Sequence, residues 1–238
     1  MLYKANLYKA IIMTTRELGV KKMNKTYDTF LFDLDGTITD SALGITNSVM
    51  YALKKFGIEE TDRAKLYKFI GPPLTESFEK FYGFTKEQSL DGVKYYREYY
   101  HDKGIYENRV YDGLEDVLKK INEAGKQAIV ATSKPEEYAK IIIDYFQLTK
   151  YFVCVAGMEM DGGRGTKAEV ITYALETNQI TDKSKVLMIG DREHDVIGAH
   201  KNGLDCLGIL YGFGSREEFE KAGADYIREK VEDILQFI

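Results

Sequence analysis

The sequence has few of the residues that form disulfides or bind soft metals: two cysteines, Cys154 and Cys206, and three histidines among 238 residues. Both cysteines lie in apolar segments typical of strands, so they are expected to be buried and reduced. No apolar run approaches the roughly 18 residues that a membrane-spanning helix needs. The N-terminus is too polar and too interrupted by lysines for a secretory signal. These absences predict a cytoplasmic protein that does not associate with a membrane.

The charge balance argues against one class of partner. The formal net charge is −5, so no broad basic face for nucleic acid is expected. Hydrophobic residues make up 44% of the chain and charged residues 30%, which is ordinary for a globular protein with a buried core. A small anionic ligand is compatible with this balance, because a few local donors can oppose the overall charge.

From about residue 26 onward, strand patterns alternate with helix patterns. The expected strands cover 29–33, 127–133, 152–157, 186–191 and 206–210. Between them lie amphipathic segments such as 113–124, whose apolar residues follow the i, i+3, i+4, i+7 spacing. This alternation is typical of a parallel sheet covered by helices, and it predicts an α/β fold.

The stretch after the first strand has a different pattern. Residues 41–57, 61–70, 74–82 and 85–103 all have helical patterns, with no strand among them. Their short connections favour a small helix bundle. We therefore predict a helical domain over 41–110, inserted into an α/β core formed by 26–40 and 111–238. Residues 1–25 form an N-terminal extension to which no role is assigned.

Charged and polar residues stand where the expected strands and helices end or begin. Open parallel sheets bind ligands at the carboxyl ends of their strands, so these side chains are expected to converge. The set consists of Asp33, Asp35, Thr132, Lys167, Asp191 and Asp195. A single Asp-Gly after a strand is ordinarily a turn. Turns do not explain such residues at four separate strand or helix ends.

A cluster of this composition predicts a bound cation. Neighbouring carboxylates repel each other, and the pKa of one of them rises strongly unless a cation intervenes. Oxygen ligands with little histidine or thiol suit Mg²⁺. A lysine and a hydroxyl beside that cation suit a phosphate dianion, whose charge they would balance during transfer. The sequence therefore predicts a magnesium site that acts on a small phosphorylated metabolite.

The motifs are similar to those of a known family. DLDGT at 33–37, Thr132, Lys167 and GDREHD at 190–195 resemble, in order and spacing, the four motifs of haloacid dehalogenase-type phosphatases. The resemblance covers about residues 27–238 and is nearest to the phosphoglycolate phosphatase-like branch. Within that branch, ATSKP at 131–135 and YGFGS at 211–215 resemble bacterial 5′-nucleotidase-type members. The resemblance to this family implies a Rossmann-like core with an inserted helical cap.

The resemblance also implies roles for the carboxylates. Asp33 would be the nucleophile that takes the phosphoryl group. Asp35 would be the general acid for the leaving alcohol and then the base that activates water. Asp33, the backbone carbonyl of Asp35, and Asp191 would hold Mg²⁺. Asp195 would bind the metal through water or orient the other ligands.

The phosphate site is expected next to these groups. The resemblance implies that Thr132 and Lys167 bind phosphoryl oxygens. Ser133 is a further candidate for phosphate binding, with a helix cap as the alternative. For Lys134 two interpretations stay open: it faces the phosphate or the cap, or it is exposed at the start of a helix.

Two other features leave alternatives open. Arg192 stands where many relatives of this type carry a small polar residue, and we interpret it as a surface arginine, with an effect on substrate fit as the alternative. The tyrosines Tyr95, Tyr96, Tyr99 and Tyr100 are interpreted as packing residues of the bundle, with stacking on a base as the alternative.

The expected activity is hydrolysis of a small phosphomonoester, with a nucleoside 5′-monophosphate as the first choice. Phosphoglycolate or a sugar phosphate is the alternative, and a phosphomutase is a more distant one. A phosphoaccepting signalling domain also gathers aspartates at strand ends, but it is about half as long and lacks the second acid that Asp35 supplies. The chain is expected to be a monomer or a homodimer.

Overall fold

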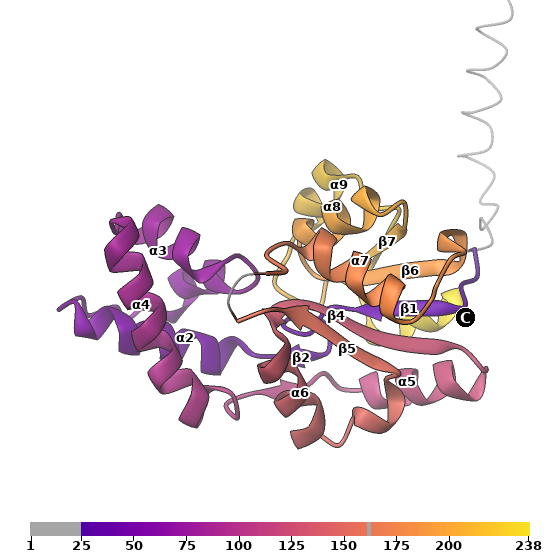
Figure 1. Ribbon diagram of the computed structural model, residues 1–238, viewed down its shortest axis with the longest axis horizontal. Helices are drawn as coiled ribbons and strands as arrows, with labels where there is room; N and C mark the ends of the chain where they lie inside the picture. Colours follow the sequence, from indigo (N-terminus) through magenta and orange to yellow (C-terminus); the bar gives the residue numbers. More distant parts are fainter. Residues whose placement is uncertain (1–24, 161–162) are drawn as a thin grey trace, which may run out of the picture.

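The computed structural model describes residues 25–160 and 163–238. Its centre is a six-stranded parallel sheet with the strand order β5-β4-β1-β6-β7-β8 (Figure 1). The strands are β1 (Thr29–Phe32), β4 (Gln127–Pro135), β5 (Cys154–Met158), β6 (Val186–Gly190), β7 (Asp205–Ile209) and β8 (Tyr226–Arg228). The predicted α/β fold is confirmed. Of the predicted extension 1–25, all but Lys25 lies outside the described residues.

Alternate residues of the strands point to opposite faces of the sheet, and each face has its own helices. Phe30 and Phe32 pack on one face, while Leu31 packs on the other. The first face is covered by α5 (Leu114–Glu123), α6 (Glu136–Tyr145) and the 3₁₀ helix η5 (Val231–Phe237). The second is covered by α7 (Lys167–Thr177), α8 (Glu193–Lys201) and α9 (Arg216–Ala222) (Figure 1). Burial on both faces explains why the central strands are apolar throughout.

Between β1 and α5, the chain forms a helical lobe, which we call the helical insert (residues 41–110). It contains α2 (Ala42–Lys55), the 3₁₀ helix η1 (Arg63–Phe69), α3 (Leu74–Tyr82), α4 (Lys86–Tyr99) and the π-helical turn η2 (Tyr100–Gly104) (Figure 1). The helices lie where the sequence places them, although 63–69 is 3₁₀ rather than α. The division into two domains stays a prediction.

The helical insert has an aromatic core. Phe78 packs on Phe69 and on Phe84, with ring centroids 5.2 and 5.5 Å apart, and Phe84 lies 4.6 Å from Phe56. These residues belong to the same continuous apolar cluster as the first face of the sheet. The helical insert is therefore packed against the sheet-bearing part as well as linked to it by the chain.

A two-stranded ribbon marks the place where the chain leaves and re-enters the sheet-bearing part. It pairs β2 (Thr39–Asp40) with β3 (Arg109–Val110) in antiparallel register. The Arg109 guanidinium lies 2.9 Å from the Asp40 carboxylate across the ribbon. The sequence analysis missed both strands, because two residues are too few for an alternating pattern.

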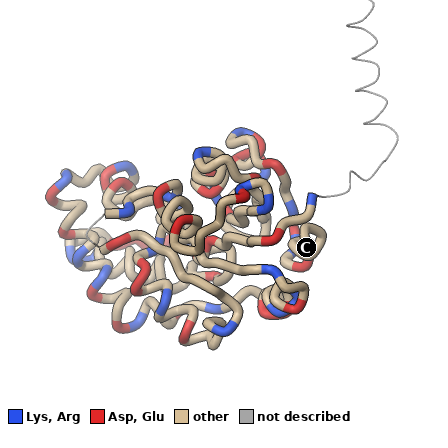
Figure 2. Tube along the Cα trace, turned by 45° about the vertical axis from the view of Figure 1, so that its right-hand side comes forward, with Lys and Arg blue, Asp and Glu red and all other residues tan. Residues whose placement is uncertain are grey.

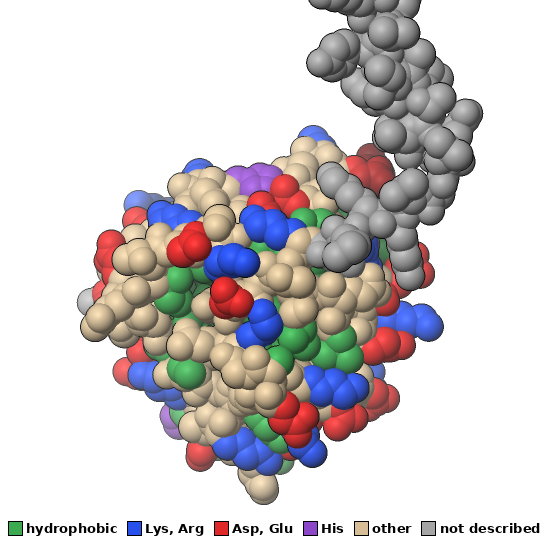
Figure 3. Space-filling view, turned by 90° about the vertical axis from the view of Figure 1, so that its right-hand side faces the viewer, with side chains coloured by type: hydrophobic (Ala, Val, Ile, Leu, Met, Phe, Trp, Pro, Cys, Tyr) green, Lys and Arg blue, Asp and Glu red, His purple; other side chains and the backbone are tan. Residues whose placement is uncertain are grey.

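The surface carries both signs of charge. Lys and Arg are interspersed with Asp and Glu over the described trace (Figure 2). The face in Figure 3 likewise mixes basic, acidic and hydrophobic side chains without a broad patch of one sign. Within the described residues, none of the helices has the length and apolar character needed to cross a bilayer.

Candidate active site

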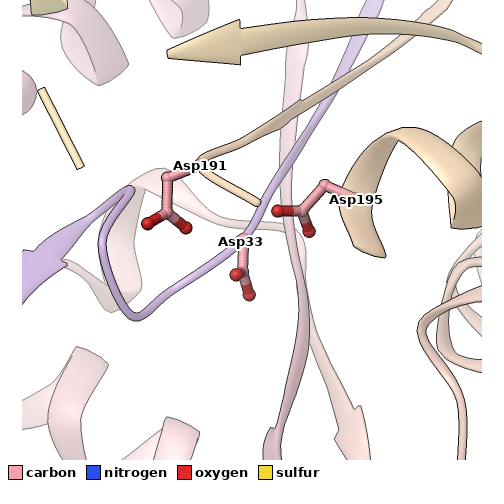
Figure 4. A group of neighbouring side chains, drawn as sticks. All are labelled: Asp33, Asp191 and Asp195. Atoms are coloured by element: carbon pink, nitrogen blue, oxygen red, sulfur yellow. The ribbon is translucent and has the colours of Figure 1, made fainter. Parts of the chain in front are cut away.

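Three aspartates meet at the carboxyl edge of the sheet. Asp33 directly follows β1 and Asp191 directly follows β6, and these two strands are neighbours in the sheet. Asp195 stands in the first turn of α8. All three are buried, and each offers a carboxylate oxygen within 4.8 Å of the others (Figure 4). The structure therefore brings together the three residues whose carboxylates the sequence analysis selected for the metal, while the fourth proposed ligand was the backbone carbonyl of Asp35.

Lys167 closes one side of this carboxylate cluster. Its Nζ lies 2.7 Å from Asp33 Oδ1 and 2.9 Å from Asp195 Oδ1, and it donates to the Ala131 carbonyl at 3.1 Å. Burial by itself lowers the pKa of Lys167, but the charges of Asp195 and Asp33 outweigh it and raise that pKa above its usual value. A protonated lysine is thus held against the predicted nucleophile.

Asp191 is enclosed by backbone. Its Oδ2 accepts a hydrogen bond from the Phe213 N–H at 2.8 Å, while its Oδ1 is buried with no hydrogen-bond partner among the described residues. A Cβ at Gly36, where φ is +85°, would lie 2.1 Å from Asp191 Oδ2, and one at Gly212 would lie 2.4 Å from Asp191 Cβ. These contacts show why glycine stands at both positions. They leave Oδ1 as the free ligand atom.

The Asp35 side chain is paired with a lysine from β4. Its Oδ2 lies 2.7 Å from Lys134 Nζ, and both side chains are largely buried. The Lys134 ammonium also lies 4.8 Å from the centre of the Tyr100 ring. Burial lowers the pKa of Lys134, but Asp35, Tyr96 and Asp33 together outweigh burial and raise that pKa above its usual value. Of the two open interpretations of Lys134, exposure at a helix start is wrong, because the side chain faces the site and the helical insert.

The two phosphate-site candidates on β4 differ in exposure. Thr132 is buried, and its Oγ1 accepts a hydrogen bond from the Lys134 N–H at 3.2 Å. Ser133 is partly exposed and borders the same cavity as Thr132. The alternative interpretation of Ser133 as a helix cap is wrong, because Pro135 is the N-cap of α6.

A cavity of about 540 Å³ lies over these residues, between the sheet edge and the helical insert. Its floor consists of Asp33, Asp35, Thr132, Lys134 and Lys167. The helical insert contributes mostly apolar and aromatic walls, among them Phe69, Pro72, Leu74, Tyr96 and Tyr100. The arrangement can hold an anionic group at the floor and a larger, less polar group above it.

Comparison with known proteins identifies the family. Residues 30–209 match the family described as haloacid dehalogenase-like hydrolase. The chain belongs to the haloacid dehalogenase-like hydrolases. It is 45% identical to a 5′-nucleotidase of Pseudomonas aeruginosa over 192 residues, which cover 81% of this chain and 86% of that protein. The crystal structure of a predicted phosphatase from Clostridium acetobutylicum superimposes with a TM-score of 0.85 at 48% identity, covering 88% of this chain and 97% of that one.

These similarities make the chain a phosphoric monoester hydrolase of the haloacid dehalogenase-like family. A more distant relative is named as a kinase rather than a phosphatase. The tyrosine-protein kinase PtkA of Mycobacterium tuberculosis is 33% identical over 197 residues, which cover 83% of this chain and 67% of that protein.

The carboxylate cluster of this hydrolase fits a divalent cation. Burial, followed by the charges of Asp195 and Asp33, raises the pKa of Asp191 well above its ordinary value. The cluster therefore lacks positive charge, although Lys167 is present. Asp33, Asp191 and Asp195 supply only hard oxygen ligands, and Asp191 Oδ1 is unpaired, as a magnesium site requires. These residues would hold Mg²⁺, which is typical of the family.

Metal binding is expected to stabilise the protein in a pH-dependent way. Burial raises the pKa of Asp195 from 3.8 to about 6, although Lys167 opposes this. Between those pH values the folded protein binds more protons at this carboxyl than the unfolded chain does. Without metal, this contribution to stability is fully present below pH 3.8 and is lost as the pH rises through 6. Bound Mg²⁺ would replace those protons as the compensating positive charge.

Thermal unfolding with Mg²⁺ and with a chelator measures this effect. With free Mg²⁺ at about 100 times its dissociation constant, we expect a gain of about 2.7 kcal/mol near pH 7.5. This corresponds to roughly 5 to 11 °C in Tm for a chain of this size. The gain should nearly vanish near pH 4.5, and Asp191→Asn should remove it. An equal gain in Asp191→Asn would show that Mg²⁺ binds elsewhere.

The remaining sequence expectations have mixed outcomes. Arg192 is not a freely exposed surface arginine, because its guanidinium is mostly buried and bonded to Ile70 and Glu218. The four tyrosines between 95 and 100 pack within the helical insert, as expected: Tyr96 and Tyr100 stack 5.3 Å apart, and Tyr95 and Tyr99 pack on Phe56 and Tyr51. Tyr96 and Tyr100 also border the cavity.

Proposed function

We propose that this hydrolase cleaves a small phosphomonoester with Mg²⁺, through an aspartyl-phosphate on Asp33. The observation that carries the proposal is the position of Asp33 at the floor of the cavity. It is buried, paired with Lys167 at 2.7 Å, and grouped with two other carboxylates that fit a cation. A carboxylate in such surroundings can attack phosphorus, because the lysine and the cation would offset its repulsion from the phosphate dianion.

In the first step, a carboxylate oxygen of Asp33 forms a bond to phosphorus while the bond from phosphorus to the ester oxygen breaks. The leaving oxygen takes a proton from Asp35, two residues further along the same turn. In the second step, Asp35 takes a proton from water, which attacks the phosphorus and restores the Asp33 carboxylate. When bound, Mg²⁺ would neutralise charge on the phosphoryl oxygens.

Lys167, Thr132 and Ser133 are the proposed phosphate-binding residues. Lys167 lies beside Asp33 and Thr132 borders the same floor, so both can reach the oxygens of a phosphoryl group placed on Asp33. Lys134, bound to Asp35, is a further donor at this floor. The side chains of Lys167 and Lys134 place two ammonium groups around the anion site, which suits a dianionic substrate.

The helical insert is the proposed cap. Residues 41–110 form one wall of the cavity, and the ribbon β2–β3 is the connection about which the cap would move. Closing the cap would exclude bulk water from the phosphoryl group. The leaving group would then lie against the apolar and aromatic wall of the helical insert.

The proposed substrate class is a nucleoside 5′-monophosphate. Three tyrosines border the cavity, Tyr96, Tyr100 and Tyr138. The Tyr100 hydroxyl is buried and has no hydrogen-bond partner in the described part of the chain, so a polar group of the ligand could bind there. Aromatic walls with an unpaired hydroxyl suit a planar base with polar edges. The 5′-nucleotidase name of the Pseudomonas aeruginosa relative supports the same class.

The test is phosphate release with Mg²⁺ from nucleoside monophosphates, phosphoglycolate, sugar phosphates and an aryl phosphate. We expect kcat/KM to be highest for a nucleoside monophosphate, by about tenfold or more over phosphoglycolate. A higher value for phosphoglycolate or a sugar phosphate would assign the protein to the alternative class. Release from none, with stable label on Asp33 or on tyrosine after incubation with ATP, would contradict hydrolysis and favour a mutase, a signalling role or a kinase.

A further inference from the structure

Arg192 joins the helical insert to the sheet-bearing part. Its Nη1 donates to the Ile70 carbonyl at 2.5 Å, and its Nε lies 2.9 Å from Glu218 Oε1. Among the hydrogen bonds and ion pairs of the described residues, the bond to Ile70 is the one that ties the segment 58–85 to the sheet-bearing part. Ile70 is fully buried, so water does not readily replace this donor.

The other end of Arg192 is part of the segment that carries the metal carboxylates. Its backbone N–H donates to Asp195 Oδ2 at 3.0 Å, and Asp191 is the preceding residue. Glu218 of α9 accepts from the Arg192 Nε and also from the Glu193 N–H at 2.7 Å. Glu218 therefore fixes the guanidinium relative to the start of α8, and the same guanidinium donates to the Ile70 carbonyl.

The loop after Ile70 lies directly on this arginine and borders the cavity. Gly71 has φ +104°, and a Cβ there would lie 3.3 Å from Arg192 Cγ. Residues 71–76 line the upper part of the cavity. A second contact is nearby, since the Tyr67 and Phe213 rings are 6.2 Å apart and the Phe213 N–H binds Asp191. The loop that would contact a leaving group is thus held by residues next to Asp191 and Asp195.

We propose that Arg192 is a positioning residue that holds the loop 70–74 of the helical insert over the carboxylate cluster and so selects leaving groups that fill the upper cavity. The phosphoryl group binds below this loop and does not need it. A large leaving group does need it, because the loop supplies one of its walls. This inference rests on the proposed role of the helical insert as the leaving-group half of the site.

The test combines hydrogen exchange with kinetics on the full chain. Arg192→Gln removes the positive charge and leaves a shorter side chain that cannot bind Glu218 and the Ile70 carbonyl together. Arg192→Lys keeps the charge, but its single ammonium can reach only one of these two partners at a time. Glu218→Gln keeps an oxygen that accepts from the Glu193 N–H but removes the ion pair with Arg192. This variant replaces Arg192→Gln in the test if Arg192→Gln does not fold. The control is Arg216→Gln, because Arg216 lies on the same helix as Glu218 and its guanidinium makes an exposed ion pair with Glu229.

In Arg192→Gln we expect amides of 63–82 to exchange about fivefold faster or more. The ratio of kcat/KM for adenosine 5′-monophosphate to that for phosphoglycolate should fall about tenfold, mainly through KM. Arg192→Lys and Glu218→Gln should lie between this variant and the wild type, and the control should match the wild type. Unchanged exchange would overturn the proposal, as would faster exchange with an unchanged ratio. If the wild type hydrolyses neither adenosine 5′-monophosphate nor phosphoglycolate, the proposed substrate class fails. Amide hydrogen exchange in Arg192→Gln then decides by itself whether Arg192 holds the loop.

Discussion

Replacing Asp33 with asparagine is expected to lower the rate of phosphate release by roughly 10⁴-fold or more. The amide has the size of the carboxylate but cannot attack phosphorus. Folding should persist, because Lys167 keeps its ion pair with Asp195 at 2.9 Å, and the loss of one buried charge reduces the repulsion on Asp191. Release of phosphate and thermal unfolding, measured on the same preparation, check both parts of this expectation.

Two comparisons separate the nucleophile from a metal ligand. In rapid-quench experiments with labelled substrate, the wild type should carry an acyl phosphate on Asp33, and Asp33→Asn should carry none. Asp191→Asn removes a proposed metal ligand only, so excess Mg²⁺ should restore part of its activity but none of that of Asp33→Asn. Asp28→Asn is the matched control, because Asp28 precedes β1 and forms an exposed ion pair with Lys126. Activity of Asp33→Asn above a tenth of the wild-type value would refute the aspartyl-phosphate route.

Replacing Lys167 with methionine should lower both activity and stability. Methionine has a similar length but no charge, so Asp33 and Asp195 lose the cation that both contact. We expect kcat/KM to fall by about 10²- to 10³-fold, because the phosphoryl oxygens lose a donor. Without metal, the free energy of unfolding at pH 7.5 should fall by about 3–5 kcal/mol, which is the usual cost of removing one partner from a buried ion pair. Urea unfolding measures this difference.

Mg²⁺ should restore part of the stability of Lys167→Met, since it supplies positive charge to the same carboxylates. It should not restore the activity, since the phosphate site stays incomplete. Lys140→Met is the control: the exposed side chain of Lys140 pairs with Glu136 at 2.6 Å along α6, and its loss should cost less than about 1 kcal/mol. Wild-type kcat/KM in Lys167→Met would mean that another residue binds the transferred phosphoryl group.

The sequence was informative where a single segment carries the signal. Apolar runs such as Thr29–Phe32 and Val186–Gly190 mark buried strands, and an aspartate directly after each run belongs to the carboxyl edge of the sheet. Because the carboxyl ends of parallel strands lie at the same edge of a sheet, Asp33 and Asp191 were both expected at that edge. The helix starting at Lys167 brings its lysine to the same place. The carboxylate cluster and its lysine were therefore predictable before any coordinates.

The sequence was uninformative where contacts join distant segments. The pair of Asp35 with Lys134 links residues about a hundred positions apart, and no local pattern distinguishes a buried lysine at a strand end from an exposed one. Arg192 was expected at the surface, because nothing near it in the sequence shows that the Ile70 carbonyl lies opposite its guanidinium. The two-residue strands of the ribbon β2–β3 exist only through their pairing with each other.

The amino-acid sequence by itself determined the α/β class, the helical character of 41–110 and the residues gathered at the carboxyl edge of the sheet. Local hydrophobic periodicity and the direction of parallel strands are sufficient for these features. Only the tertiary structure decided which partner each charged side chain takes, how the helical insert lies over the cavity, and that Arg192 connects the two. Those features depend on packing between segments far apart in the chain, which no local sequence pattern records.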